Sequence, residues 1–267
     1  MKSSTPLKSS RFIGFLLIIC GACILLFYMP PYLRNLLHYK AQEQLYMELS
    51  NTPIKSPPRN FSSTIINSYN HFTTINPDNL KPTIHKKLLP LLEINKEVIG
   101  WITINDTPIN YPLLQHSDNQ YYLTHASDNS DSIYGSIYID HRNNSDLNNL
   151  NTLIYGHNMN NGSMFHTLVN YKEQDFFTTH PYISVSNLYE TFTYEIFSVY
   201  VVNADTETIS VKYKSNEDFL NYISNCQSRS LFKTNIKLNE DDQIITLVTC
   251  SYELDNARTI VQAKKIK

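Results

Sequence analysis

The chain has 267 residues, of which 42% are hydrophobic, so it is long enough for one domain with a substantial core and additional segments. Its formal net charge of −2 excludes the strongly basic surface typical of nucleic-acid-binding proteins, and no nucleic acid is expected as a partner. Its 4 cysteines are too few for the dense disulfide framework of a small exported domain.

The first segment with a clear pattern is an apolar run at residues 12–29, which contains no charged residue. Its 18 residues are just enough to cross a bilayer as a helix. Lys2, Lys8 and Arg11 precede it, which favours a cytoplasmic N-terminus at residues 1–11 and an extracellular remainder. No small-x-small cleavage site follows the run, so the pattern favours a retained single-pass membrane anchor over a cleaved signal peptide.

A helical and polar spacer is expected at residues 30–83, before a catalytic domain at residues 84–267. Leucines recur at helical spacing over residues 32–49, and residues 51–79 are polar with several prolines, which is typical of an extracellular tether. A short helix is expected at residues 84–94.

Strand patterns dominate the chain from residue 98 onward. Nine segments show apolar alternation or short apolar runs: 98–104, 109–114, 133–139, 152–155, 182–186, 191–202, 208–213, 243–249 and 258–264. Helices are expected at 163–171 and 215–227, the second capped by Ser215. So many strands without regular strand–helix alternation predict a mainly β domain, a barrel or sandwich that carries a few helices.

The four cysteines have different surroundings. Cys20 and Cys23 lie in the apolar run, where cysteine behaves as a small hydrophobic residue, although Cys23 also allows a lipoprotein interpretation. Cys226 lies on the apolar face of the helix at 215–227 and is expected in the core. Cys250 ends an apolar strand, and a rigid strand can present a thiol as a nucleophile.

Two further residues suit thiol chemistry. Arg258 follows Cys250 by eight residues and opens the next strand, where its charge would favour a thiolate and stabilise an oxyanion. His157 follows a strand that ends at Gly156, and an imidazole there could transfer protons during acyl transfer. Taken singly, a core cysteine, a surface arginine and a surface histidine remain open alternatives.

Together these motifs resemble those of class B sortases. YGHNM at 155–159 with GSMF at 162–165 resembles the family's histidine segment, and TLVTC at 246–250 with Arg258 resembles its cysteine–arginine signature. Further matches are VIGWI at 98–102, INYPLLQ at 109–115, DNQYYL at 118–123 and GSIY at 135–138. The resemblance covers roughly residues 88–267.

The resemblance implies an eight-stranded sortase-type β-barrel, with N-terminal helices beside it and a helix between strands six and seven. It implies that Cys250 attacks the threonine carbonyl of an LPxTG-like or NPxT-like C-terminal sorting signal on a surface protein. Arg258 would stabilise the oxyanion, and His157 would protonate the leaving amine. A peptidoglycan precursor amine would then resolve the thioester. Asn110 and Leu114 fall where the family lines its peptide groove, and neither a cofactor nor a metal is implied.

The sequence departs from the family pattern at two places. Val248 stands where class B relatives often have serine, and the interval from Cys250 to Arg258 is short for the class. Both departures bear on the identity of the sorting motif rather than on the chemistry.

Two alternative functions fit parts of the sequence. A cell-wall or papain-like cysteine peptidase would also use a thiol, but those families place the cysteine before the histidine and usually at a helix N-terminus. A non-catalytic membrane-anchored adhesin or sensor domain would suit the anchor, the spacer and the β-rich domain. It would not explain the motifs that contain His157, Cys250 and Arg258.

Overall fold

A computed structural model describes residues 7–50 and 83–267 and divides the chain into two compact units, Met1–Leu45 and Tyr46–Lys267. Helix α1 (Leu7–Ser50) includes the helix expected at 32–49. Across these described ranges, no helix has both the length and the apolar character needed to cross a membrane. The anchor at 12–29 stays a prediction, and residues 51–82 of the expected spacer lie outside the described residues.

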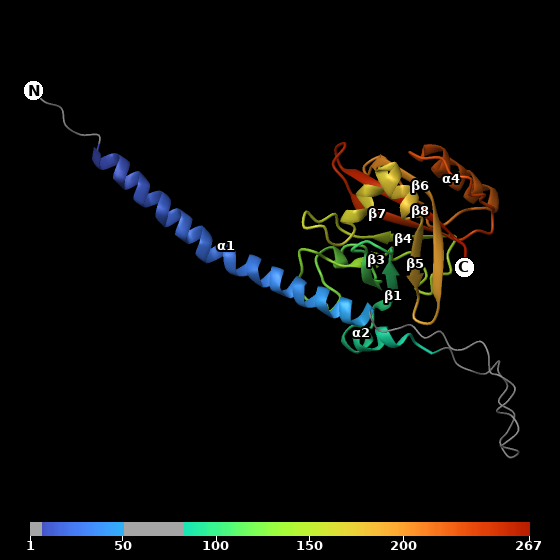
Figure 1. Ribbon diagram of the computed structural model, residues 1–267, viewed down its shortest axis with the longest axis horizontal. Helices are drawn as coiled ribbons and strands as arrows, with labels where there is room; N and C mark the ends of the chain where they lie inside the picture. The colour runs from blue at the N-terminus through green and yellow to red at the C-terminus, as the bar shows by residue number, and fades with distance from the viewer. Residues whose placement is uncertain (1–6, 51–82) are drawn as a thin grey trace, which may run out of the picture. The chain divides into compact units, whose positions relative to one another are not determined.

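The second unit is a closed eight-stranded barrel with the strand order β1-β2-β3-β4-β7-β8-β6-β5 (Figure 1). Its elements are η3 (Lys86–Leu88), α2 (Leu89–Ile94), β1 (Val98–Thr103), β2 (Asn110–Leu114), η4 (Tyr121–Leu123), β3 (Ile137–Ile139), β4 (Asn151–Tyr155), η5 (His166–Lys172), α3 (Gln174–Thr179), β5 (Tyr182–Ser186), β6 (Thr191–Asn203), α4 (Asn216–Arg229), β7 (Ile244–Cys250) and β8 (Ala257–Lys265). The expected mainly β barrel, with a helix between strands six and seven, is confirmed.

The strand directions bring particular strand ends together. β4 and β7 are neighbours and parallel, so both end at one edge of the barrel, which we call the β4–β7 rim. β3 and β8 run antiparallel to β4 and β7 respectively and therefore begin at this rim. β2 is parallel to β3 and begins there too. The rim thus collects residues from five strands that are far apart in the sequence.

Helix α4 covers one side of the barrel (Figure 1). The Ser215 hydroxyl accepts a hydrogen bond from the Asp218 amide at 3.1 Å, which confirms the expected N-cap. The buried face of α4, with Phe219, Ile223 and Cys226, packs against β6, β7 and β8. Cys226 is therefore a core residue, as its helical position predicted.

The strand expected at 208–213 is wrong, because this segment forms a loop. The Ser210 carbonyl of this segment accepts a hydrogen bond from a side chain and not from a neighbouring strand: the donor is the Asn151 carboxamide, at 2.9 Å. Tyr213 of the segment packs against Phe219 of α4, with the ring centroids 4.9 Å apart. The alternating pattern therefore reflects packing on a helix.

Two expected elements are shorter because single residues adopt left-handed backbone angles. Gly135 has φ of +57°, so β3 begins at Ile137 instead of residue 133. Met164 has φ of +56°, so the helix expected from residue 163 begins only at His166 and is a 3₁₀ helix, η5.

Candidate active site

Cys250 stands at the end of a buried strand of the barrel. β7 is hydrogen-bonded on both sides, to β4 and to β8, and its residues Ile244 to Thr249 are all buried. Cys250 is the first partly exposed residue of the strand, and its thiol is free. The strand therefore presents one partly exposed thiol at the β4–β7 rim, in a backbone that cannot shift easily.

Arg258 is the register partner of Cys250 across β7 and β8. The loop between them is closed by a hydrogen bond from the Ser251 amide to the Ala257 carbonyl at 3.0 Å. The Arg258 Nη1 donates to the carbonyls of Ala257 at 2.9 Å and Asn256 at 3.3 Å. The guanidinium is thus held by the loop backbone, on the strand position opposite Cys250, and within residues 83–267 no side-chain carboxylate pairs with it.

His157 reaches the same rim through β4. The ladder between β4 and β7 continues beyond β4, because the Gly156 amide donates to the Val248 carbonyl at 3.2 Å. The Thr249 hydroxyl donates to the Gly156 carbonyl at 2.8 Å, and the Asn158 carboxamide donates to the Cys250 carbonyl at 2.9 Å. These bonds join the residues on either side of His157 to the end of β7. The structure therefore brings all three predicted catalytic residues together.

The imidazole of His157 has a defined tautomer. Its Nε2 lies 2.7 Å from the Leu123 carbonyl oxygen at the end of η4. A carbonyl oxygen only accepts hydrogen bonds, so Nε2 carries a proton, and Nδ1 is the nitrogen left for proton transfer.

Gly135 allows this arrangement. A Cβ atom at this position would lie 2.8 Å from the Leu123 carbonyl oxygen and 3.1 Å from Cδ2 of His157. Its φ of +57° is also one that other residues rarely adopt. The close approach of the η4 carbonyl to the imidazole therefore requires glycine here.

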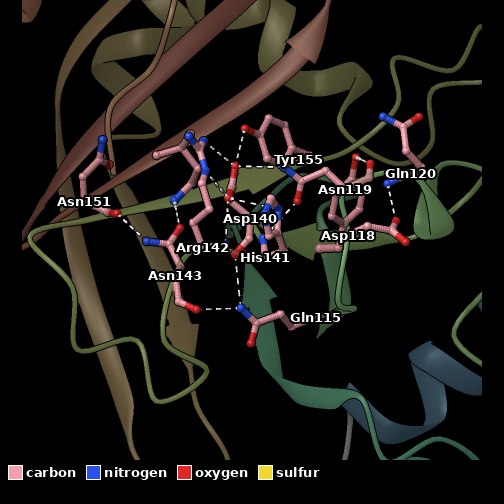
Figure 2. A network of polar contacts seen from close by, with 12 residues as sticks. Gln115, Asp118, Asn119, Gln120, Asp140, His141, Arg142, Asn143, Asn151 and Tyr155 are labelled. Atoms are coloured by element: carbon pink, nitrogen blue, oxygen red, sulfur yellow. Dashed lines mark hydrogen bonds and ion pairs between the residues drawn. The ribbon is translucent and has the colours of Figure 1, made fainter. Parts of the chain in front are cut away.

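A buried carboxylate, Asp140, lies within a network of polar side chains that includes Asn119, Arg142 and Tyr155 (Figure 2). Asp140 is fully buried and accepts two hydrogen bonds at 2.8 Å from the Arg142 guanidinium. It also accepts at 3.0 Å from the Asn119 carboxamide and from the Tyr155 hydroxyl. Burial raises the pKa of Asp140, but the hydrogen bonds from Arg142 and Asn119 outweigh burial and lower it to about 2. Asp140 is therefore an anion at neutral pH.

The Asp140 network is connected to His157 by two routes. Tyr155 is the last residue of β4, two positions before His157. Asn119 precedes η4, whose final carbonyl, that of Leu123, accepts from His157. Burial, followed by the negative charge of Asp140, raises the pKa of Tyr155, so its hydroxyl stays protonated and remains a donor. The network thus fixes both the strand and the loop that orient the imidazole.

The two predicted substrate-binding residues differ in their accessibility. Asn110 begins β2 at the β4–β7 rim and is half-buried, and its contact with a peptide is a prediction. Leu114 ends the same strand and is completely buried. Its contact with a peptide stays a prediction.

Several residues near the site were not identified from the sequence. The contact of the Leu123 carbonyl with His157 could not be predicted from the sequence, because every residue has a backbone carbonyl and only the fold decides which one meets the imidazole. Gly135 is different: it is one of only 6 glycines, this scarcity predicts a backbone position that a side chain would obstruct, and the structure confirms the prediction. Asp140 directly follows an apolar strand, and an acidic residue there could have been suspected of burial. Asn158 lies beside His157 within the recognised motif, but its bond to Cys250 depends on the fold.

A comparison with known protein families matches residues 102–266 to the sortase domain. The chain belongs to the sortase family. Sortase B of Listeria monocytogenes is 38% identical over 190 residues, which cover 70% of this chain and 77% of that protein.

Solved sortase B structures also match this fold. The structure from Clostridium perfringens has a TM-score of 0.64 and 40% identity, and the match covers 67% of this chain and 98% of that chain. A Staphylococcus aureus sortase B–substrate complex has a TM-score of 0.64 and 30% identity, and covers 69% and 87% of the two chains.

These relatives confirm the expected class B sortase. The protein is a cysteine transpeptidase of the kind that anchors surface proteins to the cell wall. Membership of the sortase family favours neither of the two alternative functions, the cysteine peptidase and the non-catalytic adhesin or sensor domain.

Proposed function

We propose that this sortase cleaves an LPxTG-like or NPxT-like sorting signal after its threonine and transfers the threonine carbonyl to a peptidoglycan precursor amine. The observation that carries this proposal is the pairing of Cys250 with Arg258 across β7 and β8, beside the parallel strand that leads to His157. Two groups from neighbouring strands and one from the segment just after β4 can then act on one carbonyl at the β4–β7 rim.

In the first step, the Cys250 thiolate attacks the threonine carbonyl, and negative charge develops on the carbonyl oxygen. Arg258 uses only Nη1 in its bonds to the loop backbone, so its remaining N–H groups can donate to this oxygen. Because the loop carbonyls already hold the guanidinium, little reorganisation is needed as the charge forms.

The collapse of this intermediate needs a proton on the leaving amine. Protonated His157 carries its second proton on Nδ1, since Nε2–H is engaged by the Leu123 carbonyl. His157 therefore donates from Nδ1 as the C–N bond breaks, and a thioester to Cys250 remains. The acceptor amine then attacks the thioester carbonyl, loses a proton to Nδ1 and releases Cys250.

We also propose that the catalytic domain is extracellular and held at the cell membrane by residues 12–29, with residues 1–11 cytoplasmic. The support is compositional: these 18 residues contain no charge and follow Lys2, Lys8 and Arg11. Protease digestion of intact protoplasts should remove the catalytic domain, whereas a cytoplasmic domain would be protected.

The test of the reaction is a peptide assay with mass spectrometry. The sortase is incubated with LPxTG and NPxT peptides, with and without an amine-bearing peptidoglycan stem peptide. We expect cleavage after threonine, a thioester adduct on Cys250 and a ligated product when the amine is present.

The other outcomes are informative as well. Hydrolysis without ligation at saturating amine would make the protein a peptidase. Failure to cleave either peptide would reject the proposed class of sorting signal.

A further inference from the structure

The contact between Trp101 and Asn110 fixes the orientation of a carboxamide at the active-site rim. The Trp101 indole Nε1 lies 2.6 Å from Asn110 Oδ1, between the neighbouring strands β1 and β2. An indole N–H can only donate, so the atom that it meets must be the amide oxygen. The orientation of this carboxamide is therefore decided by chemistry, and its Nδ2 group points away from Trp101.

The Asn110 Nδ2 group has no hydrogen-bond acceptor anywhere in residues 83–267. The Thr103 hydroxyl lies 3.5 Å from the same Oδ1 atom, so both of these contacts of the carboxamide are made by its oxygen. Asn110 is half-buried, so Nδ2 can meet a bound molecule.

The position of Asn110 relates it to the catalytic histidine. β2 begins at the rim where β4 and β7 end. The hydroxyl of the next residue, Tyr111, accepts a hydrogen bond from the Met164 amide at 3.0 Å. Met164 is followed by Phe165, whose amide donates to the His157 carbonyl at 2.8 Å. Asn110 is thus linked to the loop that holds His157 through its chain neighbour Tyr111.

Trp101 itself is firmly held. Its side chain is 1% exposed, and the Lys87 ammonium lies 4.5 Å from the centroid of its ring. A buried ring of this size has no free rotamer to adopt, so its N–H direction is set before any peptide arrives.

We infer that Trp101 is a positioning residue that holds the Asn110 carboxamide with its N–H₂ group toward the sorting signal, where it donates to an oxygen of the peptide. This inference rests on the proposed sorting-signal function. It assigns the polarity of one subsite: the subsite binds a peptide oxygen, which accepts the hydrogen bond, and disfavours a peptide group that can only donate.

The test uses Trp101→Phe, which keeps an aromatic ring against Lys87 and removes the N–H group together with the pyrrole part of the indole; this loss of ring volume is the same in both backgrounds of the cycle described next. It is combined with Asn110→Ala in a double-mutant cycle, with kcat and KM measured on the wild-type enzyme's preferred peptide. Because a single neutral hydrogen bond is lost, Trp101→Phe should lower kcat/KM by about three- to tenfold. In the Asn110→Ala background the same change should have almost no further effect, since Trp101 acts through Asn110.

Two control variants separate positioning from folding. Asn110→Asp keeps the acceptor for Trp101 but replaces the N–H₂ group with oxygen, so it should lower kcat/KM at least as much as Asn110→Ala. Ser198→Ala removes another buried hydrogen bond, the one to the Cys226 carbonyl at 2.7 Å, and should lower the melting temperature without changing kcat/KM.

Equal effects of Trp101→Phe in both backgrounds would overturn the inference, as would full activity of Asn110→Asp. A wild-type enzyme that cleaves neither LPxTG nor NPxT peptides would remove the proposed function, and the inference with it. The wild-type control therefore distinguishes the two failures.

Discussion

At the scale of single residues, the two cysteines of the barrel unit have opposite expected roles. Cys226 is 2% exposed in the core beneath α4, whereas Cys250 is partly exposed at the rim. Cys226→Ala should lower the free energy of unfolding by about 1 kcal/mol and keep peptide cleavage. Cys250→Ala should fold normally and form no thioester. Urea denaturation and intact-protein mass spectrometry check both, and a substrate adduct on Cys226 would contradict the assignment.

Arg258 is expected to contribute more to the rate than to folding. Its guanidinium bonds only to loop carbonyls, and loss of one well-placed oxyanion donor typically lowers turnover by about 10²–10³-fold. Arg258→Lys and Arg258→Ala should therefore keep the wild-type melting temperature and lose most of the acylation rate, since lysine lacks the planar set of donors. Single-turnover acylation measures this. Near-normal acylation by Arg258→Ala would show that the oxyanion is stabilised by other donors, such as backbone amides near Cys250.

At the scale of elements, the Asp140 network should make the stability of the rim dependent on acid pH. The pKa of Asp140 is about 2 in the folded protein, below its ordinary value of 3.8. The stability that its carboxylate contributes is therefore fully present above about pH 4 and is lost as the pH falls through about 2. Asp140→Asn should lower the free energy of unfolding by about 2–3 kcal/mol at neutral pH, because a charged hydrogen-bonded group is removed from Arg142.

The difference between wild type and Asp140→Asn should shrink between about pH 4 and pH 2, and thermal unfolding across this range measures it. The exposed Asp241 provides the matched control, and Asp241→Asn should change stability little at any pH. A constant difference down to about pH 2 would mean that the carboxylate is not responsible. Asp140→Asn should also lower kcat, since both Tyr155 and η4 lose a support.

At the scale of the whole molecule, the compact unit Tyr46–Lys267 includes the complete barrel and all three proposed catalytic residues. A protein that begins at Tyr46 should therefore fold and cleave peptides at the rate of the full chain in detergent. The measurement compares kcat/KM and melting temperature. An insoluble or inactive product beside an active full-length enzyme would refute this expectation.

A protein that begins at residue 84 tests the expected domain boundary. It lacks Tyr46, whose hydroxyl lies 2.6 Å from the Ser127 hydroxyl and whose ring meets the edge of Trp101 at a centroid distance of 6.0 Å. We expect it to remain active but to lose about 1–2 kcal/mol of unfolding free energy. Equal stability of the two shortened proteins would place the boundary at residue 84.

Local elements and the class of reaction could be predicted from the order of the residues alone. Strand β7 and the Ser215 cap of α4 follow from residues adjacent in the chain, because strand alternation and helix capping depend on neighbours a few positions away. The order of His157, Cys250 and Arg258 likewise predicted acyl transfer by a thiol. This reaction needs these residue types, and the surrounding motifs are specific to one family.

The contacts between segments that are distant in the sequence could be seen only in the folded chain. The bond from Thr249 to Gly156 joins residues 93 apart, and the Leu123 carbonyl that sets the His157 tautomer lies 34 residues from it. Residues 208–213 have a strand pattern but pair with no strand, because their hydrogen-bond partner is the side chain of Asn151. The partner of a backbone group depends on which segment lies beside it in the closed barrel. That placement results from the pairing of all eight strands and not from the residues adjacent in the chain.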